Sequence, residues 1–271
     1  IVALGSVLLA VAAAPVGAFS VYKGQSLIGD AIGHSTFPGI ILAYMAFATR
    51  SPVILLAGAI LAGAASYALI QLAHRDKRLG LDANLAIFLS GFFGLGMALK
   101  SFIQGNPDYA GASQAGLGTY IFGQAAYMLE ADVLLIAAIS ALVLTLLLLF
   151  YKELKLFVFD AEYAEVVGLP CRLLNLLLLV MTISVIGIGI KAVGAILISS
   201  FLIIPCVAAN QWSNNFARVL LLSSLIGAVS ALVGTYISTL EQGMSTGPSI
   251  ILVASLIAFF SIVFGTKGIL G

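Results

Sequence analysis

The sequence contains few charged residues. Asp, Glu, Lys and Arg make up 8% of its 271 residues, while 62% of the residues are hydrophobic. A soluble domain carries about 25% charged residues, so an ordinary soluble protein is excluded. The apolar residues form long runs, whereas a membrane β-barrel would show short segments of alternating polarity. We therefore expect an all-α polytopic membrane protein, and the formal net charge of +1 gives no indication of nucleic-acid binding.

Cysteine and histidine are also scarce. The two cysteines, Cys171 and Cys206, form no C-x-x-C pair and are predicted to be free thiols. Only His34 and His74 are present, which excludes a His-rich metal centre within one subunit. The chain has no G-x-x-x-x-G-K-[ST] motif for ATP and no H-E-x-x-H motif of a metalloprotease. An intramembrane enzyme is therefore disfavoured.

The apolar runs predict where the chain crosses the bilayer. A spanning helix needs about 20 apolar residues. Nine segments meet this need, at about residues 2–22, 31–49, 52–73, 83–103, 131–151, 173–190, 193–210, 216–239 and 248–265. We expect 8–9 transmembrane helices that form a single transmembrane domain over residues 1–271.

Two basic loops predict the orientation of these helices. The segments 74–78 and 151–172 each carry three Lys or Arg residues. Such loops face the cytoplasm, and the two spans between them return the chain to the same side. The apolar, glycine-containing stretch near 115–129 can then not be a further crossing. We expect a re-entrant or interfacial segment on the outer side. The backbone of such a segment must be covered by other parts of the protein or must line a water-filled cavity.

The most unusual polar residues lie in the stretch GDAIGHSTFPG, residues 29–39. Asp30 and His34 are spaced i and i+4, so a helix places both on one face with Cβ atoms about 5–6 Å apart. A carboxylate and an imidazole this close could bind one divalent metal ion. A charged residue within a spanning helix costs about 3 kcal/mol on insertion scales, and such groups usually face a cavity or the bundle interior.

Two plainer interpretations of this stretch stay open. Asp is a favoured N-cap, and Asp30 stands where its apolar segment begins. His34 could be a buried histidine bonded to a neighbouring carbonyl. For the pair together, the sequence favours a metal or proton site.

A second polar element, FDAEYAEVVGLP, lies at Phe159–Pro170. An aspartate can cap a short helix there, two glutamates in the first turns suit the helix dipole, and a glycine followed by a proline ends it. These residues are Asp160, Glu162, Glu165, Gly168 and Pro170. We expect a short amphipathic helix near 160–168 in the longest cytoplasmic loop. It is either a solvated connector or a docking surface for a cytoplasmic partner.

Together these stretches resemble the permease subunit of the manganese/zinc/iron ABC importers. The resemblance rests on GDAIGHSTFPG after a span that ends in Tyr22-Lys23, on FDAEYAEVVGLP, and on KAVGAILISSFLIIPCVAAN at Lys191–Asn210. It covers nearly the whole chain. One departure is the run from Ser35 to Phe37, which reads Ser-Thr-Phe where the family more often has Ala-Val-Leu.

The resemblance implies a multi-pass protein of a prokaryotic cell membrane. It implies two copies of this chain, two cytoplasmic ATPase subunits and an extracytoplasmic metal-binding protein. Asp30 and His34 match the family's proposed metal-contacting pair. The helix at Asp160–Pro170 matches its coupling helix, which sits in a groove of the ATPase. Because this chain lacks an ATP motif, it is not expected to be an enzyme. No cofactor is implied, since the metal is the substrate.

Two copies about a two-fold axis would offer two carboxylates and two imidazoles. Such ligands suit Mn²⁺, Fe²⁺ or Zn²⁺, and the lack of thiolate argues against Cu(I). We favour Mn²⁺, although selection for it would depend on geometry, availability or the binding protein, since manganese binds weakest in the usual order.

Two questions about this pair stay open. The alternative function is an ion-coupled secondary transporter with Asp30 and His34 as a relay, although we find no clear inverted repeat. The depth of the pair is the other question. On a simple topology Asp30 lies toward the cytoplasmic end of its helix. A mid-membrane site requires that the Lys23–Gly29 connection enter the bilayer.

Overall fold

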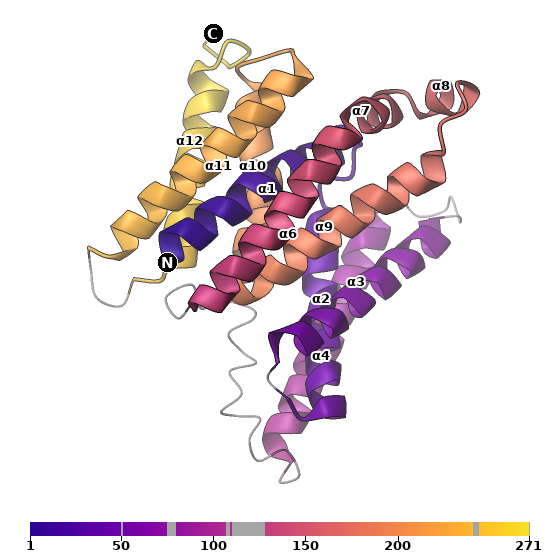
Figure 1. The fold of residues 1–271 in the computed structure, drawn as a ribbon, viewed down its shortest axis with the longest axis vertical. Coiled ribbons are helices and arrows are strands. Elements are labelled where there is room, and N and C mark those ends of the chain that lie inside the picture. Colours follow the sequence, from indigo (N-terminus) through magenta and orange to yellow (C-terminus); the bar gives the residue numbers. More distant parts are fainter. Residues whose placement is uncertain (50, 75–79, 107–108, 110–127, 241–243, 271) are drawn as a thin grey trace.

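The computed structural model describes the chain except for residues 50, 75–79, 107–108, 110–127, 241–243 and 271. The described ranges form eleven helices and no strand (Figure 1), which confirms the all-α prediction. The helices are α1 (Val2–Tyr22), α2 (Ile28–Phe47), α3 (Pro52–His74), α4 (Leu81–Gly105), α6 (Glu130–Leu149), α7 (Tyr151–Phe159), α8 (Ala161–Val166), α9 (Cys171–Val193), α10 (Ala195–Asn210), α11 (Phe216–Ser238) and α12 (Thr246–Phe264).

Each of the nine predicted spans coincides with a helix. Seven of these helices are long and apolar enough to cross a membrane, namely α1, α3, α4, α6, α9, α11 and α12. The other two are α2, which contains Asp30 and His34, and the shorter α10. Residues 115–127 of the segment predicted near 115–129 lie outside the described residues. The re-entrant or interfacial character of this segment therefore stays a prediction.

The helices form two lateral groups with α1 and α9 between them (Figure 1). On one side α10, α11 and α12 pack together, and on the other side α2 packs against α3 and α4. Helix α1 contacts the first group and α6, while α9 contacts both groups. Helix α2 therefore packs mainly against α3, α4, α9 and α10, and these helices surround the stretch with Asp30 and His34.

Several helix ends that carry basic residues gather at one face of the bundle, which we call the basic face. The Tyr22 hydroxyl donates to Asn210 Oδ1 at 2.8 Å and joins the ends of α1 and α10. The Tyr22 and Phe159 rings both pack against Phe216 at the start of α11. Lys267, just after α12, donates to Asn210 Oδ1 at 3.4 Å. The basic residues of the 74–78 loop lie outside the described residues. That both basic loops share this face, and that the face points to the cytoplasm, stay predictions.

The segment predicted as the longest loop contains a helix of its own. After Phe150, α7 continues the chain as an amphipathic helix. Leu154 and Phe157 are buried, while Lys152 and Lys155 are exposed. The sequence analysis identified no helix between the span that ends near residue 151 and Asp160, and this one forms because the apolar face of α7 packs against α1 and α9.

Helices α2 and α3 cross in backbone contact at two glycines. A Cβ atom on Gly39 would lie 2.2 Å from the Gly58 carbonyl oxygen, and one on Gly58 would lie 2.4 Å from the Gly39 oxygen. Small residues allow spanning helices to approach this closely. The crossing fixes α3 against the half of α2 that follows Pro38.

We expect Gly39→Ala to lower the thermal stability of the purified protein. The added methyl group forces the two backbones apart, and such overpacking costs about 1–3 kcal/mol. The measurement is a thermal melt in detergent, with Gly91→Ala in α4 as the matched control. Nothing lies within 4 Å of a Cβ on Gly91. Equal melting temperatures for Gly39→Ala and the control would contradict the crossing.

Candidate metal site

Asp30 and His34 lie together on one side of α2. The distance from His34 Nε2 to Asp30 Oδ1 is 3.5 Å, and the two side chains are 19% and 32% exposed, respectively. The i, i+4 spacing therefore brings the carboxylate and the imidazole together, as the sequence predicted. A single first-row metal ion can bind both groups, because carboxylate and imidazole are common ligands of Mn²⁺, Fe²⁺ and Zn²⁺.

The structure excludes the helix-cap interpretation of Asp30. Helix α2 begins at Ile28, its N-cap is Leu27, and no side chain caps it. Asp30 is thus an acidic residue inside the first helical turn, and it interacts with side chains rather than with the backbone N–H groups that a cap would bind. It contacts His34 and also accepts a hydrogen bond from Ser199 of α10.

Two residues that the sequence did not indicate complete the surroundings of the pair. Ser199 lies beside Asp30, and its Oγ is 3.6 Å from the position of a Cβ on Gly33. The Phe93 ring of α4 meets the His34 ring edge to face, with centroids 5.1 Å apart. Ser199 and Phe93 come from distant parts of the chain, so no local pattern could have revealed them.

The pair lies at mid-depth in the bundle. Phe93 stands midway along α4. Gly63 stands midway along α3, and a Cβ there would lie 3.2 Å from Ile32 of α2. The first turns of α2 are therefore level with the middles of two membrane-spanning helices. The connection from Lys23 to Leu27 must enter the bundle, as a mid-membrane site requires.

One chain supplies few donors to this site. Within the described ranges no group of three or more His, Cys, Asp or Glu side chains could hold a metal ion. Leu27, Asp30 and His34 follow one another along one side of α2, and all three are at least partly exposed in the single chain. The pair thus opens onto a face of α2 that the described residues leave partly uncovered.

The residues of the second polar element form the predicted short helix. Asp160 is the N-cap of α8, and its Oδ1 accepts a hydrogen bond from the Tyr163 backbone N–H at 2.9 Å. Gly168 has a φ of +86°, which favours glycine, and Pro170 is the N-cap of α9. Glu162 and Glu165 are exposed.

Large apolar side chains are also exposed on and after α8. Val166 is 83% exposed, and Tyr163 and Val167 are each 55% exposed. Helix α8 lies at the upper right of Figure 1, beyond the ends of the spanning helices, and packs only against the neighbouring α7 and α9 among the contacts described. The structure thus brings the α8 residues together, but at a place separate from Asp30 and His34.

Residues 1–265 match the ABC 3 transport family. The chain belongs to this family. It is 39% identical over 263 residues to the manganese transport system membrane protein MntC of Bacillus subtilis, covering 97% of this chain and 60% of that protein. It is also 39% identical over 266 residues to the zinc transport system membrane protein TroC of Treponema pallidum, covering 98% of this chain and 88% of that protein.

A solved structure shares the fold of this family member. The structure of PsaBC from Streptococcus pneumoniae in complex with Fab matches with a TM-score of 0.86 and 27% identity, covering 98% of this chain and 91% of that one. These matches confirm the resemblance to permease subunits of metal ABC importers. They also confirm a multi-pass protein of a prokaryotic cell membrane. The chain spans less than two thirds of the length of the Bacillus protein.

Proposed function

We propose that this chain is the membrane-spanning subunit of an ATP-driven importer, and that Asp30 and His34 bind a divalent transition metal as it crosses. The pair carries this proposal. A carboxylate and an imidazole 3.5 Å apart stand at mid-depth on a partly exposed face of an otherwise apolar bundle. Ionisable groups at such a depth have a functional role by default.

The metal site is completed by a second copy of the chain. A two-fold axis beside the exposed side of α2 brings two Asp30–His34 pairs together, which gives four ligands. This arrangement explains why polar groups in the membrane interior remain partly uncovered in one chain. Leu27, on the same side of α2, contributes apolar contact between the copies.

The energy comes from a separate subunit. Two cytoplasmic ATPase subunits dock on the dimer, one at the α8 helix of each copy. On α8 and just after it, Tyr163, Val166 and Val167 form an exposed apolar patch. The exposed Glu162 and Glu165 lie beside this patch. Apolar side chains that project beyond the membrane-spanning helices favour a protein partner over a solvated connector. An extracytoplasmic binding protein delivers the metal to the opposite face.

The chemistry of the pair suits several cargo metals. The two relatives named above are described as manganese and zinc transport proteins, and a carboxylate–imidazole set accommodates both metals and Fe²⁺. Among these we favour Mn²⁺, whose preference for oxygen ligands is met by two carboxylates in the dimer.

The test is reconstitution of the chain with its ATPase and binding protein in proteoliposomes. We expect Mn²⁺ to move against its gradient only when ATP is hydrolysed, and a non-hydrolysable analogue to abolish uptake. Zn²⁺ and Fe²⁺ are assayed in parallel to rank the metals. If the chain alone moves metal against a gradient, or a proton gradient replaces ATP, the secondary-transporter alternative is correct and this proposal is wrong.

A further inference from the structure

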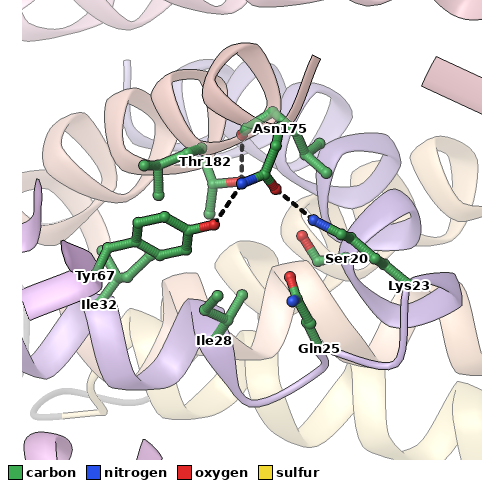
Figure 2. Close-up of a pocket in the computed structure, with 10 residues that line it drawn as sticks. Ser20, Lys23, Gln25, Ile28, Ile32, Tyr67, Asn175 and Thr182 are labelled. Atoms are coloured by element: carbon green, nitrogen blue, oxygen red, sulfur yellow. Dashed lines mark hydrogen bonds between the residues drawn. The ribbon is translucent and has the colours of Figure 1, made fainter. Parts of the chain in front are cut away.

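A chain of hydrogen bonds crosses the pocket between α1, α3 and α9 (Figure 2). The Lys23 ammonium donates to Asn175 Oδ1, and Asn175 Nδ2 donates to the Tyr67 hydroxyl at 2.8 Å. The Tyr67 oxygen also accepts from Gln71 Nε2 at 2.7 Å. We call these four residues the Lys23 cluster. It ties the residue after α1 to the first part of α9 and the last part of α3.

Lys23 holds its charge among neutral groups. Its ammonium lies 4.7 Å from the centre of the Phe157 ring, a cation–π contact. In the described part of the chain no carboxylate pairs with it. Burial lowers the pKa of Lys23 to about 8. Lys23 is partly buried, and an ammonium partly withdrawn from water without an opposite charge is destabilising, which indicates that its position has a use.

The two partners of Lys23 stand on either side of α8. Phe157 belongs to α7 and lies three residues before the Asp160 cap, while Asn175 lies in the second turn of α9, after Pro170. One ammonium group thus contacts both segments that carry α8. Both contacts are direct, with no other helix between Lys23 and its two partners.

Lys23 also stands at the start of the connection that leads into α2. Ile28 and Ile32 line the same pocket, on the side of α2 that faces away from Asp30 and His34. The Lys23 cluster therefore does not touch the metal pair. It lies beside the first turns of α2, from whose opposite side the pair projects.

We propose that Lys23 is a positioning residue that couples α8 to the Asp30–His34 pair. A displacement of α8 moves Phe157 and Asn175 together, and the ammonium passes this displacement to the Lys23–Leu27 connection and so to the start of α2. The inference rests on the proposed function, since it assumes an ATPase at α8 and a metal at the pair. It adds the physical link between those two places.

The test is Lys23→Met in the reconstituted complex with its ATPase and binding protein. Methionine keeps an apolar side chain against Phe157 and removes the ammonium. We expect the number of Mn²⁺ ions imported per ATP hydrolysed to fall about fivefold or more, the lower range of allosteric coupling, while ATP hydrolysis changes less than twofold. Lys23→Arg retains a positive charge that can contact both Phe157 and Asn175. We expect this variant to keep at least half of the wild-type ratio of Mn²⁺ imported per ATP hydrolysed.

Two further variants separate coupling from folding. Lys267→Met removes a lysine that donates to Asn210 on the same basic face, away from α8, and is expected to leave the ratio unchanged. The double variant Lys23→Met with Asn175→Leu removes both members of this part-buried polar pair, while the Tyr67 hydroxyl keeps its hydrogen bond from Gln71. This variant should assemble and still be uncoupled.

The outcomes are distinct. An unchanged ratio in Lys23→Met, or an equal fall in Lys267→Met, would overturn the coupling role. So would an assembled double variant with a normal ratio. If the wild-type complex hydrolyses ATP but imports no metal, the proposed function itself fails. If the wild-type complex imports metal normally and Lys23→Met has the same ratio of metal imported per ATP, the coupling role is refuted but the proposed function is not.

Discussion

Replacing Asp30 or His34 with alanine is expected to lower ATP-dependent Mn²⁺ uptake by at least about 100-fold, while ATP hydrolysis continues. Mutation of a residue that only hydrogen-bonds to a metal ligand typically lowers metal affinity or activity by about 10–100-fold. These substitutions remove a ligand itself, and they remove it from both copies of the dimer. Because the pair is partly exposed and outside the packed core, the chain should still assemble. Uptake and ATP hydrolysis are measured together in proteoliposomes.

His74→Ala is the matched control, since His34 and His74 are the only histidines in the sequence. His74 ends α3 and is exposed, so its removal should leave uptake unchanged. Asp30→Asn separates charge from shape, because the amide fits the same space but binds a divalent ion weakly. Normal uptake in both alanine variants would remove Asp30 and His34 from the metal path.

Placing a carboxylate on the exposed side of α8 is expected to uncouple the ATPase. Val166→Glu should lower ATP-dependent Mn²⁺ uptake by about 30-fold or more, because an unpaired charge buried at an interface costs about 2–5 kcal/mol. Val166 is 83% exposed in the isolated chain, so the substitution has no folded core to disturb. Co-purification of the ATPase with the variant chain measures the loss of docking directly.

The control for this substitution uses the same chemical change elsewhere. Ile269 is 79% exposed, follows α12 and lies near the basic face, so Ile269→Glu adds a carboxylate away from α8. We expect it to retain the ATPase and normal uptake. Equal behaviour of the Val166 and Ile269 variants would mean that α8 is a solvated connector.

The spanning helices could be predicted from the sequence because each is a local property of one apolar run. Helix α7 could not, although its Leu154 and Phe157 have the spacing of an amphipathic helix. Its nine residues are too short to form a stable helix alone, and the helix forms because those two side chains find a buried place in the fold.

The candidate metal site also has one feature that the sequence could predict and others that it could not. The proximity of Asp30 and His34 follows from helical geometry alone, so the sequence was sufficient to predict it. Their depth was not predictable, because it depends on where α1 ends and on how Lys23 and Asn175 hold the following connection inside the bundle. Ser199 reaches Asp30 only after α10 has packed against α2.

A single residue joins α9 to α10. Gly194, with a φ of +87°, is the C-cap of one helix and the N-cap of the other, and both it and Val193 are buried. This turn lies at the end of the bundle opposite the basic face. In the predicted orientation, with the basic face toward the cytoplasm, this buried turn offers no epitope to an antibody raised against the outside of the cell.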